Sequence, residues 1–198
     1  MFDRMRAQLA RHPAPLRLSS ILRRFTRERS GVAVIEFALI AGPFLALTFA
    51  IMETAIVFFA GQALETATAD AARLILTGQA QTQGLSATTF KDKVCAKIFG
   101  LFNCASGVYV DVKKYTSFAS VSITNPIDTG GNFKTTGFGY DPGGPGDIVV
   151  VRLYYKWPVY VNLIGFNLAN VSGGFNLLAA TAVFRNEPYT TSSPPSST

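Results

Sequence analysis

The feature that most limits what this chain can fold into is an apolar run near its N-terminus. The thirty residues 32–61 contain no basic side chain, and their only charges are Glu36 and Glu53. A helix that crosses a bilayer needs about 20 predominantly apolar residues. At about 1.5 Å per residue, a helix of this run is long enough for the hydrocarbon and both interfaces. The run therefore predicts a transmembrane helix over residues 32–61.

The formal charge of +6 lies wholly before this run. Residues 1–31 carry eight arginines against Asp3 and Glu28, whereas residues 32–198 carry ten basic and ten acidic side chains. A nucleic-acid-binding domain spreads its basic residues over a folded surface, so this distribution predicts no nucleic-acid partner. A basic leader before a membrane helix, with no basic residue just after it, predicts a cytoplasmic N-terminus. The rest of the chain is then expected outside the inner membrane.

A cleaved secretory signal and a permanent signal anchor are two other kinds of membrane segment that could explain this run. A cleaved secretory signal normally has about 7 to 15 apolar residues, whereas sixteen uncharged residues stand between Glu36 and Glu53. A permanent signal anchor fits the length but gives the glutamates no role. A carboxylate inside a membrane costs on the order of 2.5 to 3.5 kcal/mol on insertion scales, so each glutamate needs a functional reason.

Helix-forming sequence continues beyond the apolar run. Residues 62–77 are rich in alanine and leucine, and Gly78 is a natural helix stop. We therefore expect one helix over residues 32–77, which Pro43 bends because it removes a backbone hydrogen bond. The amphipathic extension over 62–77 is expected to pack on an outer domain.

The outer domain is expected over residues 78–188, and residues 189–198 resemble a disordered tail. After a short linker, Thr89 and Asp92 resemble the capping box of a short second helix. Apolar residues follow at spacings of three and four, which is typical of a helix face: Phe90, Val94, Ile98 and Leu101.

Strand-type sequence fills the rest of this domain. The segments with period-two alternation or long β-compatible runs are residues 108–112, 121–123, 148–157 and 177–186. They predict four or more strands in a mostly antiparallel β-sheet. The glycine-rich segment 128–147 is expected to be a long loop. The fold class is therefore α+β, with a long N-terminal transmembrane helix that continues into an extracytoplasmic domain.

The two cysteines, Cys95 and Cys104, are nine residues apart. In an oxidising compartment a local disulfide is expected, and two buried free thiols are the alternative. Cys-x8-Cys is not a usual pair of metal ligands, and beyond the membrane run no His, Met or further Cys completes a site. No metal and no cofactor are expected.

Catalytic motifs are mostly missing from the sequence. The one histidine, His12, lies in the leader, which excludes Ser-His-Asp and Cys-His arrangements and zinc chemistry of the HExxH type from the outer domain. The sequence predicts a protein that is not an enzyme. A hydrolase with an unmarked carboxylate pair stays as an alternative. Calcium binding is a weaker alternative than solvated turns for three aspartates of the glycine-rich region: Asp128, Asp141 and Asp147.

An aromatic group ends the predicted strand 148–157. Its members are Tyr154, Tyr155, Trp157 and Tyr160. Packing in the core and against the sheet is the expected role of these side chains, and a surface that contacts another protein is the alternative.

The junction between leader and apolar run carries the most specific motif. In residues 23–44, RRFTRERSGVAVIEFALIAGPF, a basic stretch ends at Gly31, Val32 follows, and Glu36 stands fifth after the glycine with Phe37 beside it. This junction resembles a type IV prepilin-class signal. It is more closely similar to the Gly-x4-Glu-Phe signal of the TadE-like pseudopilins of tight adherence (Flp/Tad) pilus systems. Further segments that fit this family are Pro43, residues 51–53, residues 70–73 and residues 182–187.

The resemblance implies a minor pilin or pseudopilin that takes part in assembly or initiation of a Flp-type pilus. A prepilin peptidase would cut after Gly31 and leave Val32 as a free amino terminus. Glu36 would then meet the terminal amine of a neighbouring subunit, because two charges that are each costly in the membrane are less so together. Glu53 would reach water near the outer interface or contact another subunit.

The same resemblance implies the partners and the location. The partners are a prepilin peptidase, other pilin and pseudopilin subunits, and the inner-membrane assembly platform. The chain would cross the inner membrane once, with its C-terminal domain periplasmic or extracellular. An uncleaved, signal-anchored extracytoplasmic binding protein is the alternative function.

Overall fold

The computed structural model describes residues 31–98, 100, 102–162 and 165–190. Its elements form the predicted α+β fold and are, in chain order, α2 (Val32–Leu76), α3 (Gln79–Thr82), α4 (Ala87–Cys95), α5 (Cys104–Gly107), β1 (Val108–Tyr115), the 3-10 helix η2 (Phe118–Ser120), β2 (Ile148–Pro158) and β3 (Phe175–Arg185). The predicted leader up to residue 30, with His12, and the tail from residue 191 lie outside the described residues. Contacts divide the chain after Ala46 into two compact units.

The first unit contributes residues 31–46, which form the N-terminal part of α2. Pro43 lies inside the helix, which continues past it. Most of these side chains are exposed although they are apolar. By length and composition α2 is a candidate membrane span, and its most apolar 18-residue window contains no buried residue. A single N-terminal membrane helix was predicted, and this finding agrees with it.

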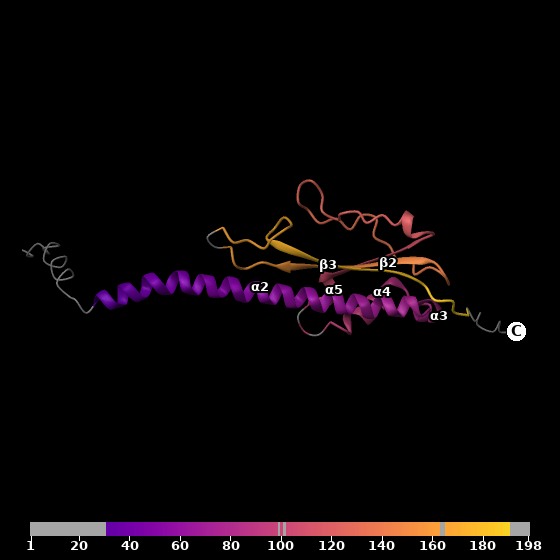
Figure 1. Ribbon diagram of the computed structural model, residues 1–198, viewed down its shortest axis with the longest axis horizontal. Helices are drawn as coiled ribbons and strands as arrows, with labels where there is room; N and C mark the ends of the chain where they lie inside the picture. Colours follow the sequence, from indigo (N-terminus) through magenta and orange to yellow (C-terminus); the bar gives the residue numbers. More distant parts are fainter. Residues whose placement is uncertain (1–30, 99, 101, 163–164, 191–198) are drawn as a thin grey trace, which may run out of the picture. The chain divides into compact units, whose positions relative to one another are not determined.

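In the second unit, the rest of α2 supports the sheet. One stripe of the helix, spaced at three and four residues, is buried, because successive members of such a series fall on one side of a helix: Glu53, Val57, Ala60, Leu64, Ala67, Ala71 and Ile75. Packing therefore starts at Glu53, earlier than the predicted extension over 62–77. Figure 1 shows this part of α2 running beneath β2 and β3.

The helix ends at Leu76, one residue before the predicted end. Gly78 follows with φ 75° and donates its backbone N–H to the carbonyl of Ile75 at 2.9 Å. A Cβ at Gly78 would lie 2.4 Å from the ring of Tyr189, so glycine is needed both for the turn and for the close approach.

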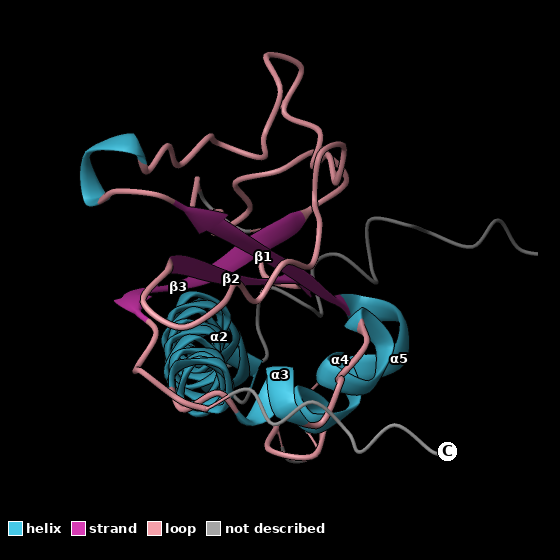
Figure 2. Cartoon of the chain, turned by 90° about the vertical axis from the view of Figure 1, so that its right-hand side faces the viewer, coloured by secondary structure: helices cyan, strands magenta, loops and turns pink. Residues whose placement is uncertain are grey.

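The sheet has three antiparallel strands in the order β1-β2-β3. One face packs on the helices, where Val112, Val151 and Leu153 are fully buried in one core with Leu64 of α2 and Phe90 of α4. Loops cover part of the other face, as Figure 2 shows. Successive side chains of a strand point to opposite faces of the sheet, so the period-two pattern of these strands places alternate residues on the helix side and on the loop side.

The sequence expectation of a strand at residues 121–123, and with it the expected number of strands, is wrong. Residues 121–123 form no strand, so the sheet of the described residues has three strands rather than four or more. Instead, a capping box between Ser117 and Ser120 closes η2, and the carbonyl of Thr124 accepts a hydrogen bond from Arg152 at 3.1 Å. The alternation of Val121 and Ile123 does not produce a strand here. Ile123 is exposed, so it gains no burial from pairing with the sheet.

The second helix, α4, also differs from its prediction at both ends. Its N-cap is Ser86, whose hydroxyl accepts the backbone N–H of Thr89 at 3.2 Å, so Thr89 is not the cap. The helix ends at Cys95, and Ile98 is buried beyond it. Leu101 lies outside the described residues. The predicted long loop at 128–147 is confirmed.

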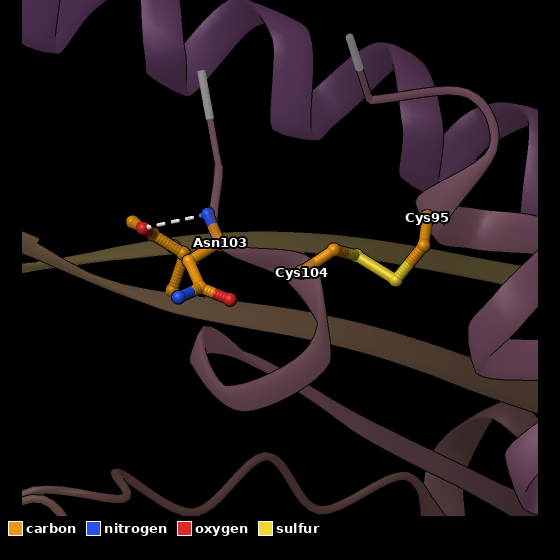
Figure 3. Close-up of a disulfide and its surroundings, with 4 residues drawn as sticks. Cys95, Asn103 and Cys104 are labelled. Carbon is orange, nitrogen blue, oxygen red and sulfur yellow. Dashed lines mark hydrogen bonds between the residues drawn. A yellow bond between two sulfur atoms is a disulfide. The ribbon is translucent and has the colours of Figure 1, made fainter. Parts of the chain in front are cut away.

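The predicted disulfide joins Cys95 to Cys104, with the two Cα atoms 5.6 Å apart. It connects the end of α4 to the start of α5, as Figure 3 shows. Next to it, the backbone N–H of Asn103 donates to the hydroxyl of Tyr155 at 3.2 Å. The bond and the ring of Tyr155 thus hold the segment that leads into β1 against the helix-facing side of the sheet.

Candidate functional site

The four residues of the predicted processing junction lie at the start of α2. Gly31 precedes the helix, and Val32, Glu36 and Phe37 are all exposed. A Cβ built on Gly31 meets no atom within 4 Å, so the described structure does not need glycine at this position.

Glu36 and Glu53 differ sharply in their surroundings. Among the residues that the structure describes, Glu36 has no hydrogen-bond or ion-pair partner. Residues 32–72 contain no Lys, Arg or His, so α2 itself offers no cation before Arg73. A carboxylate on an apolar helix face without a partner is costly in a membrane. Glu36 is therefore the group of this segment that most needs a positive charge from elsewhere.

Glu53 is satisfied within its own chain. Glu53 is only 8% exposed. The carboxylate accepts the backbone N–H of Tyr160 at 2.6 Å and the N–H of Val161 at 3.1 and 3.2 Å. Hydrogen bonds to an ionised acceptor are among the stronger ones. The expectation that Glu53 reaches water is wrong, and the internal hydrogen bonds give it a role that needs no second subunit: it fastens the loop after β2 to α2.

A buried ion pair lies at the centre of the other face of the sheet. Asp111 of β1 and Arg152 of β2 are register partners, and the guanidinium donates twice to one carboxylate oxygen, from Nε at 3.1 Å and from Nη2. The second carboxylate oxygen accepts the backbone N–H of Gly139 at 2.9 Å, and Arg152 Nη1 donates to the carbonyl of Thr124. The pair thus holds two loops onto the sheet, a role that the sequence analysis missed.

Aromatic side chains lie on both faces of the sheet, and on the face of this pair the ring of Tyr154 is 5.9 Å from the guanidinium of Arg152. Tyr154 stacks on Phe138 with ring centroids 5.3 Å apart and lies 5.8 Å from Phe133. Burial raises the pKa of Tyr154. On the helix-facing side, Tyr155 packs edge to face on Phe102 at 4.6 Å.

The predicted aromatic group is therefore divided among three environments. Tyr154 is in the loop-covered face, and Tyr155 and Trp157 are on the helix side with Phe102. Core packing is confirmed for Tyr154 and Tyr155, which are buried. Tyr160 is different, because it is 82% exposed.

The three aspartates of the glycine-rich region do not come together. Asp128 pairs with Lys134 at 3.0 Å, Asp141 pairs with Lys114 at 3.6 Å, and Asp147 accepts the N–H of Gly144. The backbone hydrogen bond from Asn132, followed by the contact with Lys134, lowers the pKa of Asp128 to about 2. Within the described part of the chain, no three His, Cys, Asp or Glu side chains gather as a metal site.

Three surface depressions of the described residues each contain a single carboxylate. A depression of about 390 Å³ between α2 and α4 has one carboxylate, that of Asp70, beside Arg73, Lys93 and Lys97. Two others have one carboxylate each, Glu187 and Asp128. A carboxylate-pair hydrolase gains no support from these sites.

The fold is that of a protein in which a long, apolar N-terminal helix continues into an α+β domain. A family model described as TadE-like protein matches residues 31–73. The match begins at Gly31 and runs along α2 to Arg73, so this segment is similar to TadE-like proteins, the family that the sequence motif resembles. It is consistent with a pilin-like protein of Tad pilus systems. No curated protein and no solved structure matches the chain.

The buried ion pair gives the first testable prediction. Arg152→Met leaves the Asp111 carboxylate buried without its guanidinium, which typically costs about 3 to 5 kcal/mol. Lys114→Met is the matched control, because it removes the cation of an exposed pair with Asp141, worth about 1 kcal/mol or less. The measurement is chemical unfolding of the full chain in detergent, followed by the fluorescence of Trp157, the chain's one tryptophan. Equal losses in the two variants would contradict the anchoring role.

Proposed function

We propose that this protein is a minor pilin or pseudopilin, processed by a prepilin peptidase, that takes part in assembly or initiation of a Flp-type (tight adherence) pilus. The observation that carries the proposal is the junction itself. The TadE-like match begins at Gly31, the residue that precedes an exposed apolar helix with Glu36 in its second turn. The mechanism is assembly rather than catalysis, so no substrate, metal or cofactor is involved.

Processing is the first step. The peptidase cuts the peptide bond after Gly31 at the cytoplasmic face, which removes the basic leader and leaves Val32 with a free amine. The open space around Gly31 supports this step, because a glycine that packs against nothing within 4 Å leaves the backbone accessible. Glycine also loosens the helix start, where the peptidase must reach an extended peptide bond.

Charge pairing is the second step. The Val32 amine of one subunit meets the Glu36 carboxylate of its neighbour, and each charge relieves the cost of placing the other in lipid. The lack of a partner for Glu36 among the described residues supports this role. Phe37, exposed beside it, supplies apolar contact area for the same helix-to-helix contact.

Location and partners follow from the same mechanism. The chain sits in the inner membrane with its N-terminus in the cytoplasm and its outer domain in the periplasm or outside the cell. Its partners are the prepilin peptidase, other pilin and pseudopilin subunits, and the inner-membrane assembly platform. The competing function is an uncleaved, signal-anchored binding protein, for which the junction would have no use.

Processing is tested by the mass of the mature chain. In cells with an active prepilin peptidase, the wild-type chain is expected to begin at Val32, whereas Gly31→Leu is expected to retain residues 1–31. Gly42→Leu is the matched control, because Gly42 lies in α2, away from the junction, and like Gly31 has no atom within 4 Å of a built Cβ. A wild-type chain that keeps its leader under these conditions would favour the anchored binding protein.

The charge pair is tested by a second pair of variants. Glu36→Gln removes the charge but is expected to be processed and inserted normally, because Gly31 is untouched. Its incorporation into sheared pili is expected to fall at least several-fold. Glu65→Gln, at another exposed glutamate of α2, is expected to assemble like the wild type. The measurement is the amount of each chain in the pilus fraction relative to the membrane, and equal amounts for both variants would remove the charge-pair role.

A further inference from the structure

Large exposed side chains lie on α2 just after Glu53 and on the loop that is bound to Glu53. On α2 they are Ile56, Phe58 and Phe59, of which the two phenylalanines are 71% and 63% exposed. Tyr160, 82% exposed, joins them because its backbone N–H is bound to the Glu53 carboxylate at 2.6 Å. We call these four residues the aromatic belt. Four large apolar or aromatic side chains exposed on this short part of α2 and on the loop bound to it need another medium or molecule to cover them.

The belt carries almost no charge. No charged residue occurs between Lys156 and Arg185, a stretch that includes the whole loop after β2, and none occurs between Glu53 and Glu65. The one acid at this level, Glu53, directs its carboxylate to the N–H groups of Tyr160 and Val161 inside its own chain. The surface here is therefore uncharged on both the helix and the loop.

Counting along the sequence locates this level relative to a membrane. From Val32, the about 20 residues that cross the hydrocarbon end near Ile51. The belt residues of α2 follow within about 12 Å of helix rise, which is where the headgroup layer begins. Tyrosine and other amphipathic aromatic side chains concentrate at this depth, because the ring contacts acyl chains while the hydroxyl reaches water and headgroups.

We propose that the aromatic belt lies in the outer headgroup layer of the bilayer, so that the outer domain rests on lipid. Glu53 acts as the fastener: it holds the loop after β2 against α2 and keeps Tyr160 at the depth of Phe58 and Phe59. The inference needs α2 to cross a membrane, but it needs neither processing at Gly31 nor assembly into a pilus. It goes beyond the proposed function by assigning a lipid contact to a loop of the outer domain.

The test uses nitroxide labels on the full chain in vesicles of phosphatidylethanolamine and phosphatidylglycerol. Tyr160→Cys carries the label, and mass spectrometry first verifies that Cys95 and Cys104 remain joined. Accessibility to oxygen, which concentrates in lipid, is compared with accessibility to a water-soluble nickel chelate. The ratio of oxygen to nickel accessibility at Tyr160→Cys is expected to be several-fold higher than at Phe118→Cys.

Two controls make the result decisive. Phe118 is 60% exposed on η2, across the sheet from α2 (Figure 2), and serves as the water-exposed reference. Ile40→Cys, at a position 70% exposed on α2, is the lipid reference. Nickel accessibility at Tyr160→Cys equal to that at Phe118→Cys would overturn the proposal, and so would protection from both reagents, which would indicate a protein partner. A water-exposed label at Ile40→Cys would instead refute the membrane span itself.

Discussion

The contact between one stripe of α2 and one face of a three-stranded sheet is the interaction on which the outer domain depends. The stripe contains three alanines, Ala60, Ala67 and Ala71, whose small side chains let the sheet lie close to the helix. Leu64 fills the space between them and is fully buried with Val151 and Leu153. The stripe belongs to the same helix, Val32–Leu76, whose residues towards the N-terminus are apolar and exposed.

This arrangement separates the roles of the two glutamates in the apolar run. Glu53 stands where the buried stripe begins, and the chain satisfies its carboxylate with two backbone N–H groups. Glu36 stands on the exposed part of the helix, where the described residues provide no partner. The same residue type thus serves folding at one position and is available for another molecule at the other. Only the second fits a role in assembly.

Local patterns in the sequence were enough to predict much of the fold. The apolar run, the stop at Gly78, the two long strand segments and the Cys95–Cys104 pair all depend on neighbouring residues or on short loops. The failures have non-local causes. Residues 121–123 alternate like a strand but lie in a loop. The carbonyl of the next residue, Thr124, accepts a hydrogen bond from Arg152, 28 residues further along the chain.

The residues of the candidate site were proposed from a local pattern as well. Gly31, Val32, Glu36 and Phe37 form a contiguous motif that needs no tertiary structure. The partner of Glu53 could not be found this way, because Tyr160 is 107 residues further along the chain. For the pair of Asp111 and Arg152, a weak signal existed: each is a charged residue with an apolar residue on either side in a strand segment, and such charges are usually paired when buried.

Hydrogen–deuterium exchange of the full chain in lipid vesicles tests most directly whether α2 carries the outer domain. Peptides that cover residues 57–72 lie beyond the length needed to cross the hydrocarbon, so their amides are slow only if this part of the helix is packed under the sheet. We predict exchange as slow as that of β2. Exchange as fast as that of the exposed segment 119–123 would show that the helix frays outside the membrane and that the sheet does not rest on it.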